Sequence, residues 1–312
     1  MIQIFKTLED GILNVENDIS DGCWIALTRP DATELENVAS RCGVDLDDLR
    51  APLDEEERSR LVIEDNYTLI LVDIPMIEDK EEKDRYVTIP LGIVLTDEVI
   101  ITVCLEETGV LTPFMQGRIR SFYTFKKTRL ILQILYRNAT LFLQYLRNID
   151  RKSGDIEEKL HISQKNQELI ELLELEKSLV YFTTSLRSNE VVLEKMVRAE
   201  RIKKYPDDEE LLEDVIIENK QAIEMANIYS GILSGMMDAF ASVISNNLNI
   251  VMKLLATITI VLSIPTMIAS FFGMNFVDIP LGGYRHGFLV VSIGTWIITG
   301  VVALILAKKK MF

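Results

Sequence analysis

Apolar positions divide the chain into three parts, and the first part is typical of an α/β domain. Short β-branched runs predict strands at residues 24–27, 67–74, 87–95 and 99–105. Residues 31–41 follow Pro30 with the apolar spacing of a helix. Every residue in 78–85, EDKEEKDR, is charged, so we expect a solvated hairpin loop between two strands there. We assign residues 1–125 to this domain.

The second part has helical periodicity. Apolar residues recur at three- and four-residue steps around 130–145 and again around 169–186, with charged residues on the other faces. Two long antiparallel helices account for this pattern. They form a hairpin over residues 126–206, with Gly154 and Asn189 as the expected interruptions.

The third part begins with a strong helix start, Pro206-Asp207-Asp208-Glu209-Glu210, in which acidic residues lie at the positive end of the helix dipole. No strong helix breaker follows before Pro265, where we expect a local kink. One helix over residues 208–272 would be roughly 100 Å long. We divide it into a stalk, residues 207–249, and an apolar end, residues 250–275.

Two uncharged runs are each long enough to cross a bilayer. The first has 24 residues between Lys253 and Asp278, and the second has 21 residues over 287–307. Each can span a hydrocarbon core of about 30 Å as a helix. Lys253 lies at the start of the first span, and the basic tail, residues 308–312, follows the end of the second. These positive charges favour the cytoplasmic side for the start of the first span and for the end of the second. The connecting loop, residues 276–286, is then external. We also expect the front domain to be cytoplasmic, because the N-terminus lacks a signal-peptide pattern.

One side of the first span is small and polar. At helical spacing it carries Asn249, Met252, Ala256, Thr259, Ser263, Thr266 and Ser270. Close helix packing and pore lining explain this stripe equally well, because small and hydroxyl residues are enriched wherever membrane helices touch. The second span is bulkier and lacks such a stripe, so we expect it to face lipid.

The end of the first span decides between these interpretations. The tripeptide Gly273-Met274-Asn275 stands there, before a short loop, a second span and a lysine-rich tail. In these features the chain resembles the CorA family of magnesium transporters. The resemblance implies a homopentameric funnel in the cell (inner or plasma) membrane, with the first span inside and the second outside. Sequence physics by itself requires only a ring, because two spans cannot enclose a water-filled path.

The resemblance also implies site residues. Gly273, Met274 and Asn275 would form a selectivity filter, in which a ring of Asn275 amide oxygens accepts hydrogen bonds from the waters of an intact hydrated Mg²⁺. Without the motif, Asn275 would be read as a helix C-cap. The implied pore-facing positions are Asn249, Met252, Leu255, Ala256, Thr259, Ser263, Thr266 and Ser270. Met252 and Leu255 are candidates for an apolar constriction that gates by dewetting.

Regulatory Mg²⁺ is implied between neighbouring subunits. Asp214 matches a carboxylate position of the family on the long helix, and Asp79 is its approximate partner in the charged connector. Bound Mg²⁺ would then hold the ring closed, and its loss would open it. The loop departs from the family, because Asp278 is its only acidic residue, so we expect weak steering of ions there.

Composition excludes several other functions. With 33 basic and 48 acidic residues, the net charge is −15. This charge argues against a nucleic-acid partner and is compatible with a protein that binds or transports cations. Cys23, Cys42 and Cys104 have no CxxC spacing, and only two histidines are present, so a zinc cage is not expected. No nucleophile–base pairing or phosphate loop indicates an enzyme. The alternatives left open are transport of Co²⁺, Ni²⁺ or Zn²⁺, and a membrane-anchored sensor or scaffold.

Overall fold

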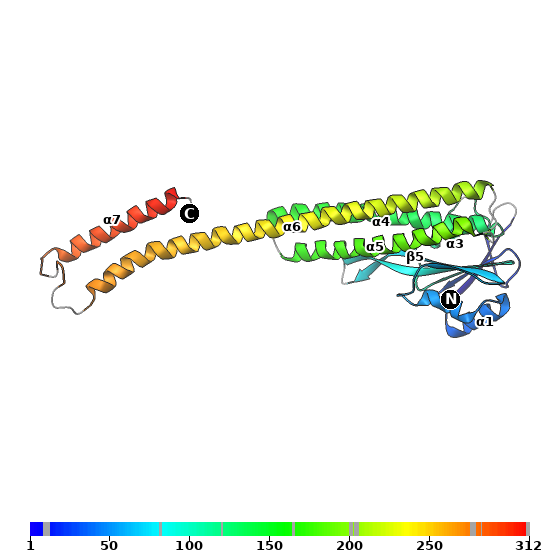
Figure 1. Ribbon diagram of the computed structural model, residues 1–312. Helices are drawn as coiled ribbons and strands as arrows, with labels where there is room; N and C mark the ends of the chain where they lie inside the picture. Colours follow the sequence, from blue (N-terminus) through cyan, green and yellow to red (C-terminus); the bar gives the residue numbers. More distant parts are fainter. Residues whose placement is uncertain are drawn as a thin grey trace. The chain divides into compact units, whose positions relative to one another are not determined.

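The computed structural model describes residues 1–8, 13–80, 83–119, 121–163, 166–199, 202, 206–274, 279–281 and 283–309. The chain divides into two compact units, Met1–Met237 and Asp238–Phe312. Figure 1 shows the fold and labels some of its helices and strands.

The first unit is built on a seven-stranded mixed sheet of order β2-β1-β3-β7-β6-β5-β4. The strands are β1 Ile2–Thr7, β2 Leu13–Glu16, β3 Trp24–Thr28, β4 Arg60–Ile63, β5 Tyr67–Lys80, β6 Lys83–Thr96 and β7 Ile100–Cys104. Only the β3–β7 pair is parallel among these described neighbours. The four predicted strands are therefore confirmed as β3, β5, β6 and β7.

Helices cover both faces of this sheet. α1 (Ala32–Cys42), α2 (Leu46–Arg50) and the 3-10 turn η1 (Ala51–Leu53) pack on one face. The short α3 (Thr112–Met115) and the long α4 (Lys127–Ser163) and α5 (Asn166–Arg198) pack on the other face (Figure 1). Side chains from the first turns of α6 (Pro206–Phe272) belong to the same core. Side chains alternate along β3 accordingly. Trp24 and Ala26 lie in the core under α4 and α5, whereas Ile25 and Leu27 lie in the core under α1.

We predicted a loop at residues 78–85, and this prediction is wrong for residues 78–80 and 83–85, which the structure describes as strands. β5 continues to Lys80 and β6 begins at Lys83, so residues 78–80 and 83–85 belong to a long β-hairpin. Glu78 lies opposite Arg85 in this ladder. Cross-strand pairing uses backbone N–H and C=O groups, and a pair of opposite charges supports it, so a run of charged side chains does not end the strands.

The predicted interruptions at Gly154 and Asn189 are also wrong, because both residues lie inside helices, α4 and α5. Gly154 is exposed and has open space around it, so the helix tolerates it. Asn189 is buried and has hydrogen-bond partners outside its helix. Its amide accepts from the Asp73 N–H at 2.8 Å and donates to the Asp73 carbonyl at 2.8 Å, which fixes α5 to β5.

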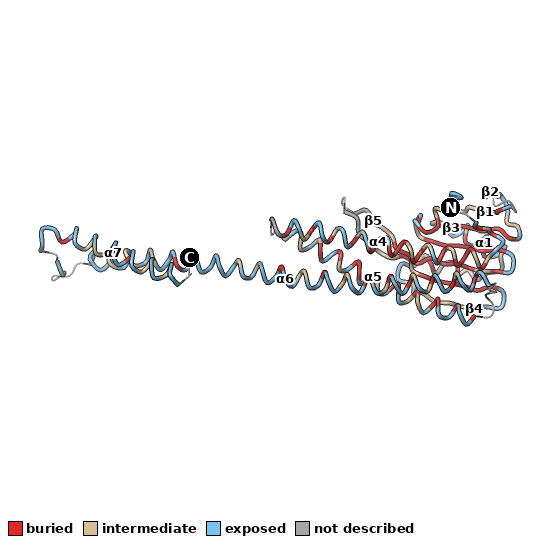
Figure 2. Tube along the Cα trace, turned by 90° about the horizontal axis from the view of Figure 1, so that it is seen from above, coloured by how far each residue is buried: buried red, intermediate tan, exposed pale blue. Residues whose placement is uncertain are grey.

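The second unit contains the apolar helices. α6 runs without interruption from Pro206 to Phe272, 67 residues, and so begins in the first unit and ends in the second, as predicted. α7 spans Gly287–Lys308. The most apolar 18-residue windows of α6 and α7 have mean hydropathies of 2.0 and 2.5, and 6% of each window is buried (Figure 2). Helices this apolar and this exposed need a bilayer or other copies to cover them.

Candidate ion-conducting site

The predicted pore stripe lies on one side of α6, and that side is uncovered. Each of its members is exposed in the single chain: Asn249, Met252, Leu255, Ala256, Thr259, Ser263, Thr266 and Ser270. Met252 and Leu255, the predicted constriction, are 55% and 57% exposed. No residue of the second unit's described part therefore shields this side.

The opposite side of α6 is shielded by α7. Buried or half-buried residues of the apolar end of α6 are Thr257, Val261, Ile264, Pro265 and Ile268. On α7 the corresponding set includes Gly287, Val291, Ser292, Thr295 and Thr299. Members of both sets line one pocket, so these sides face each other. At ~100° per residue, the shielded side of α6 is centred roughly half a turn from the stripe.

The hydroxyl groups of Thr259, Ser263 and Thr266 in the stripe donate to their own helix. Thr259 Oγ1 donates to the Leu255 carbonyl at 2.8 Å, Ser263 Oγ to the Ile260 carbonyl at 2.8 Å, and Thr266 Oγ1 to the Leu262 carbonyl at 2.9 Å. Because each proton is used in this way, the oxygen lone pairs are left to accept. A hydrated cation presents water hydrogens outward, so acceptors are the groups it requires.

α6 ends where the motif begins. The Gly273 N–H donates to the Ala269 carbonyl at 2.9 Å, and the Met274 N–H to the Phe271 carbonyl at 3.4 Å. Gly273 does not adopt the left-handed conformation that glycine often takes at a helix end. Space around Gly273 is tight, because a Cβ at this position would lie 3.3 Å from the Ala269 carbonyl oxygen. Met274 is 45% exposed. Asn275 and Asp278 lie outside the described residues.

The predicted regulatory carboxylates lie on different elements. Asp214 is exposed on α6, and Asp79 lies in β5, opposite Asp84 in the hairpin ladder. The side chain of Asp79 is outside the described part of the structure. Within the described residues, no group of three or more His, Cys, Asp or Glu side chains is arranged to hold a metal ion.

A polar cluster under α5 was not predicted. Asp73, Ser59, Thr88 and Ser185 line a pocket of ≈ 430 Å³ in the first unit. Burial raises the pKa of the Asp73 carboxyl above its usual value of 3.8, and the Ser185 and Ser59 hydroxyls offset part of this effect. Asp73 lies within an apolar strand run, and the single charge in that run was the only signal for a buried carboxyl.

Comparisons with known proteins decide the family. The CorA-like Mg²⁺ transporter protein family matches residues 20–309. The chain belongs to this family. Among its CorA relatives, the cobalt/magnesium transport protein of Methanocaldococcus jannaschii is 27% identical over 277 residues, covering 86% of this chain and 84% of that protein. The corresponding CorA protein of Thermotoga maritima is 24% identical over 322 residues, covering 98% and 88%.

The fold of CorA extends over the whole chain. The complete structure of the CorA magnesium transporter from Methanocaldococcus jannaschii aligns with a TM-score of 0.85 at 24% identity, covering 98% of this chain and 97% of that one. CorA proteins are transporters and not enzymes, so the predicted class of protein is confirmed. α6 and α7 are accordingly the two apolar helices of a CorA membrane protein.

Proposed function

We propose that this chain forms a channel for passive, potential-driven uptake of hydrated Mg²⁺. The observation that supports it most directly is the uncovered polar side of α6, which lies opposite the side covered by α7. Copies arranged in a ring would bring these stripes together around one axis and leave α7 outside. We infer a homopentamer from the family resemblance, with both termini in the cytoplasm. Active protein with a monomeric mass in detergent would contradict the ring.

The ion keeps its water shell in this proposal. Mg²⁺ dehydrates reluctantly, so a pathway of acceptors suits it better than a set of direct ligands. Thr259, Ser263 and Thr266 supply lone pairs along the pathway. Their small side chains leave width for the hydrated ion. The membrane potential supplies about 4.6 kcal/mol per divalent ion per 100 mV, twice the value for one charge.

Selection occurs at Gly273-Met274-Asn275 at the outer mouth, and gating at Met252 and Leu255 near the inner mouth. The two bulky side chains are exposed toward the same side as the hydroxyls. In a ring they form an apolar constriction, which excludes water and ions when it narrows. Asn249 lies one turn further toward the stalk.

Magnesium uptake into proteoliposomes with an inside-negative potential tests the function and the filter together. We expect uptake by the wild type and its loss in Asn275→Ala, because the amide acceptor is removed. Asn246→Ala is the matched control, since Asn246 is exposed on the same helix but lies off the stripe. Uptake that Asn275→Ala leaves intact would keep the channel and reject the filter. No uptake by folded wild type would favour a membrane-anchored scaffold.

Cobalt is a second candidate ion, because both curated relatives are named cobalt/magnesium transport proteins. Co²⁺ also binds water octahedrally and would use the same acceptors. Competition between Mg²⁺ and Co²⁺ in the uptake assay shows which of the two ions the channel prefers. Ni²⁺ and Zn²⁺ serve as further competitors in the same assay.

Feedback by cytoplasmic Mg²⁺ completes the proposal. The exposed carboxylate of Asp214 supports it, because a solvent-facing acid on the long helix is accessible to a neighbouring protomer. Asp79 is the proposed partner from the hairpin. Mg²⁺ between them would offset the repulsion among highly acidic subunits, and its release would loosen the ring.

A further inference from the structure

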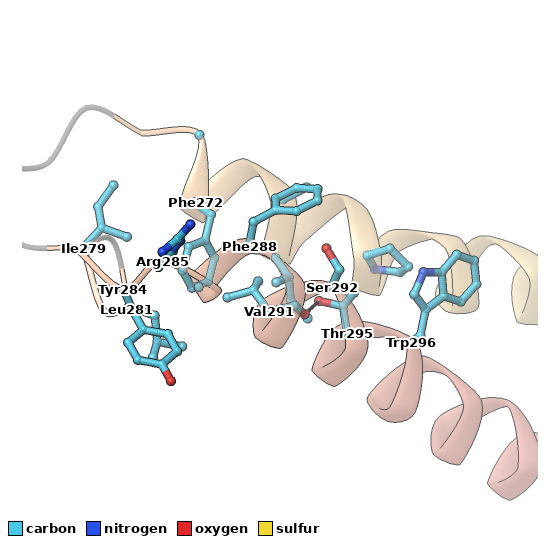
Figure 3. A pocket seen from close by; sticks show the side chains of 15 residues that line it. Phe272, Ile279, Leu281, Tyr284, Arg285, Phe288, Val291, Ser292, Thr295 and Trp296 are labelled. Atoms are coloured by element: carbon cyan, nitrogen blue, oxygen red, sulfur yellow. Dashed lines mark hydrogen bonds between the residues drawn. The ribbon is translucent and has the colours of Figure 1, made fainter.

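The second unit contains a pocket between its two helices that the ion pathway does not use. It has a volume of ≈ 660 Å³ and is lined by the end of α6, the start of α7 and the loop residues next to them. Its walls are mainly apolar and include Phe272, Phe288 and Trp296 (Figure 3). Phe288 is 88% exposed and Trp296 is 73% exposed, so the pocket opens to the surroundings of the helices.

The length of the pocket matches one leaflet of a bilayer. Along α7 it extends from Gly287 to Trp296, and in Figure 3 Trp296 lies at the end away from the loop residues. Nine residues of helix rise about 14 Å. Half of a hydrocarbon core of about 30 Å is ~15 Å. The loop that joins two membrane-spanning helices lies at a membrane surface, so the pocket reaches from that surface to about the middle of the bilayer.

One charge lies at the surface end. Among the described residues that line the pocket, Arg285 carries the only charged side chain, and no carboxylate accompanies it there. Tyr284, from the same loop, is 61% exposed and also lines the pocket. An arginine at the interface above an apolar groove presents a planar fork of donors that fits a phosphate group. Tyrosine is typical of the headgroup level.

We propose that this pocket binds one anionic phospholipid. Its phosphate pairs with Arg285, and one acyl chain lies between α6 and α7 with its end near Trp296. The apolar walls remove the chain from contact with water, while the guanidinium selects the charge of the headgroup. This proposal requires the two helices to span the membrane but is independent of the filter, the pore and the regulatory carboxylates.

Tryptophan fluorescence tests the proposal directly. The chain has two tryptophans, and Trp24 is fully buried in the first unit, so bromine atoms on lipid acyl chains can quench only Trp296. The full-length protein is reconstituted in phosphatidylcholine vesicles that contain a minor share of brominated phosphatidylglycerol or, in parallel, brominated phosphatidylcholine. We expect brominated phosphatidylglycerol to quench Trp296 as if it were about fivefold enriched over phosphatidylcholine next to this residue. This is the effect expected from one arginine at the membrane surface.

Arg285→Gln should abolish this preference, and Arg285→Lys should retain part of it. Lys309→Gln is the matched control, because Lys309 lies just beyond the other end of α7 and should not alter the quenching. In the wild type, raising the ionic strength should weaken the preference, which tests the charge without any variant. Equal quenching by both lipids, or a preference that survives Arg285→Gln, would overturn the proposal. No quenching by either lipid would mean that protein, such as a second copy, fills the pocket, and would also overturn it.

Discussion

At the scale of single residues, the buried polar contacts could not be predicted from the sequence. Asn189 is 116 positions from Asp73 in the sequence, and only the fold brings its amide to the Asp73 backbone. The sequence predicted an interruption at Asn189, because asparagine is a weak helix former. Its burial reverses that interpretation, because an amide that satisfies a buried N–H and C=O stabilises the contact of α5 with the sheet.

The buried Asp73 carboxyl predicts a pH dependence. Its folded-state pKa is raised by burial, so the folded state holds the proton more tightly than the unfolded chain, whose value is near 3.8. The free energy of unfolding should therefore fall as pH rises from about that value through the folded pKa. Asp73→Asn should remove this fall and be more stable than the wild type at neutral pH.

Denaturant unfolding across acidic to neutral pH measures the effect. Asp97→Asn, at an exposed turn position, is the control and should follow the wild-type curve. Parallel curves for wild type and Asp73→Asn would show that Asp73 does not have the assigned role.

At the scale of elements, long apolar patterns were predictable and short ones were not. The four central strands and the uninterrupted α6 were confirmed, because each buries many apolar residues at a regular period. β1, β2 and β4 were missed. β2 and β4 have four residues each, and their side chains are mostly half-buried, so their apolar alternation is weak. The charged ends of β5 and β6 were missed because backbone pairing continues past the buried part.

Two glycines should respond to alanine in opposite directions. Gly92 lies buried in β6, and an added Cβ would overlap Pro52 Cγ of η1, whose ring is rigid. We expect Gly92→Ala to lower the free energy of unfolding by about 1–3 kcal/mol. Gly154, exposed in α4 with open space around it, should instead gain about 0.5–1 kcal/mol on replacement by alanine.

Thermal unfolding of Gly92→Ala and Gly154→Ala beside the wild type measures whether each substitution lowers or raises the stability of the protein. Each variant is the control for the other, since both change glycine to alanine in the first unit. A Gly92→Ala protein as stable as the wild type would mean that η1 does not pack closely on β6.

At the scale of the whole molecule, one chain carries only part of the function. The stripe was predicted from spacing, and each of its members is exposed on one side of α6 in the single chain. Its role as a pore lining stays a prediction. The partner surfaces could not be predicted, because they belong to other copies. The same holds for the regulatory site, because the described part of the single chain has no group of three or more His, Cys, Asp or Glu side chains that could hold a metal ion at Asp214.

The feedback proposal predicts the behaviour of a double variant. Asp214→Asn with Asp79→Asn should keep transporting when Mg²⁺ is high on the cytoplasmic side, a condition under which we expect the wild type to close, because no ion then links the protomers. Glu209→Gln, also exposed near the start of α6, is the control and should close normally. Mg²⁺ flux at low and high internal Mg²⁺ measures the difference. Normal closure of the double variant would exclude these two carboxylates as the sensor.

The course of α6 has a consequence for biosynthesis. Leu212 and Val215, in its first turns, belong to the same core as Val192 and Leu193 of α5, and the first apolar span follows later in the same helix. During translation the ribosome makes the last pieces of the soluble core just before the segment that directs the chain to the membrane. We therefore expect the apolar face of α4 and α5 to stay uncovered until shortly before insertion, and the nascent chain to be most prone to aggregation at this stage.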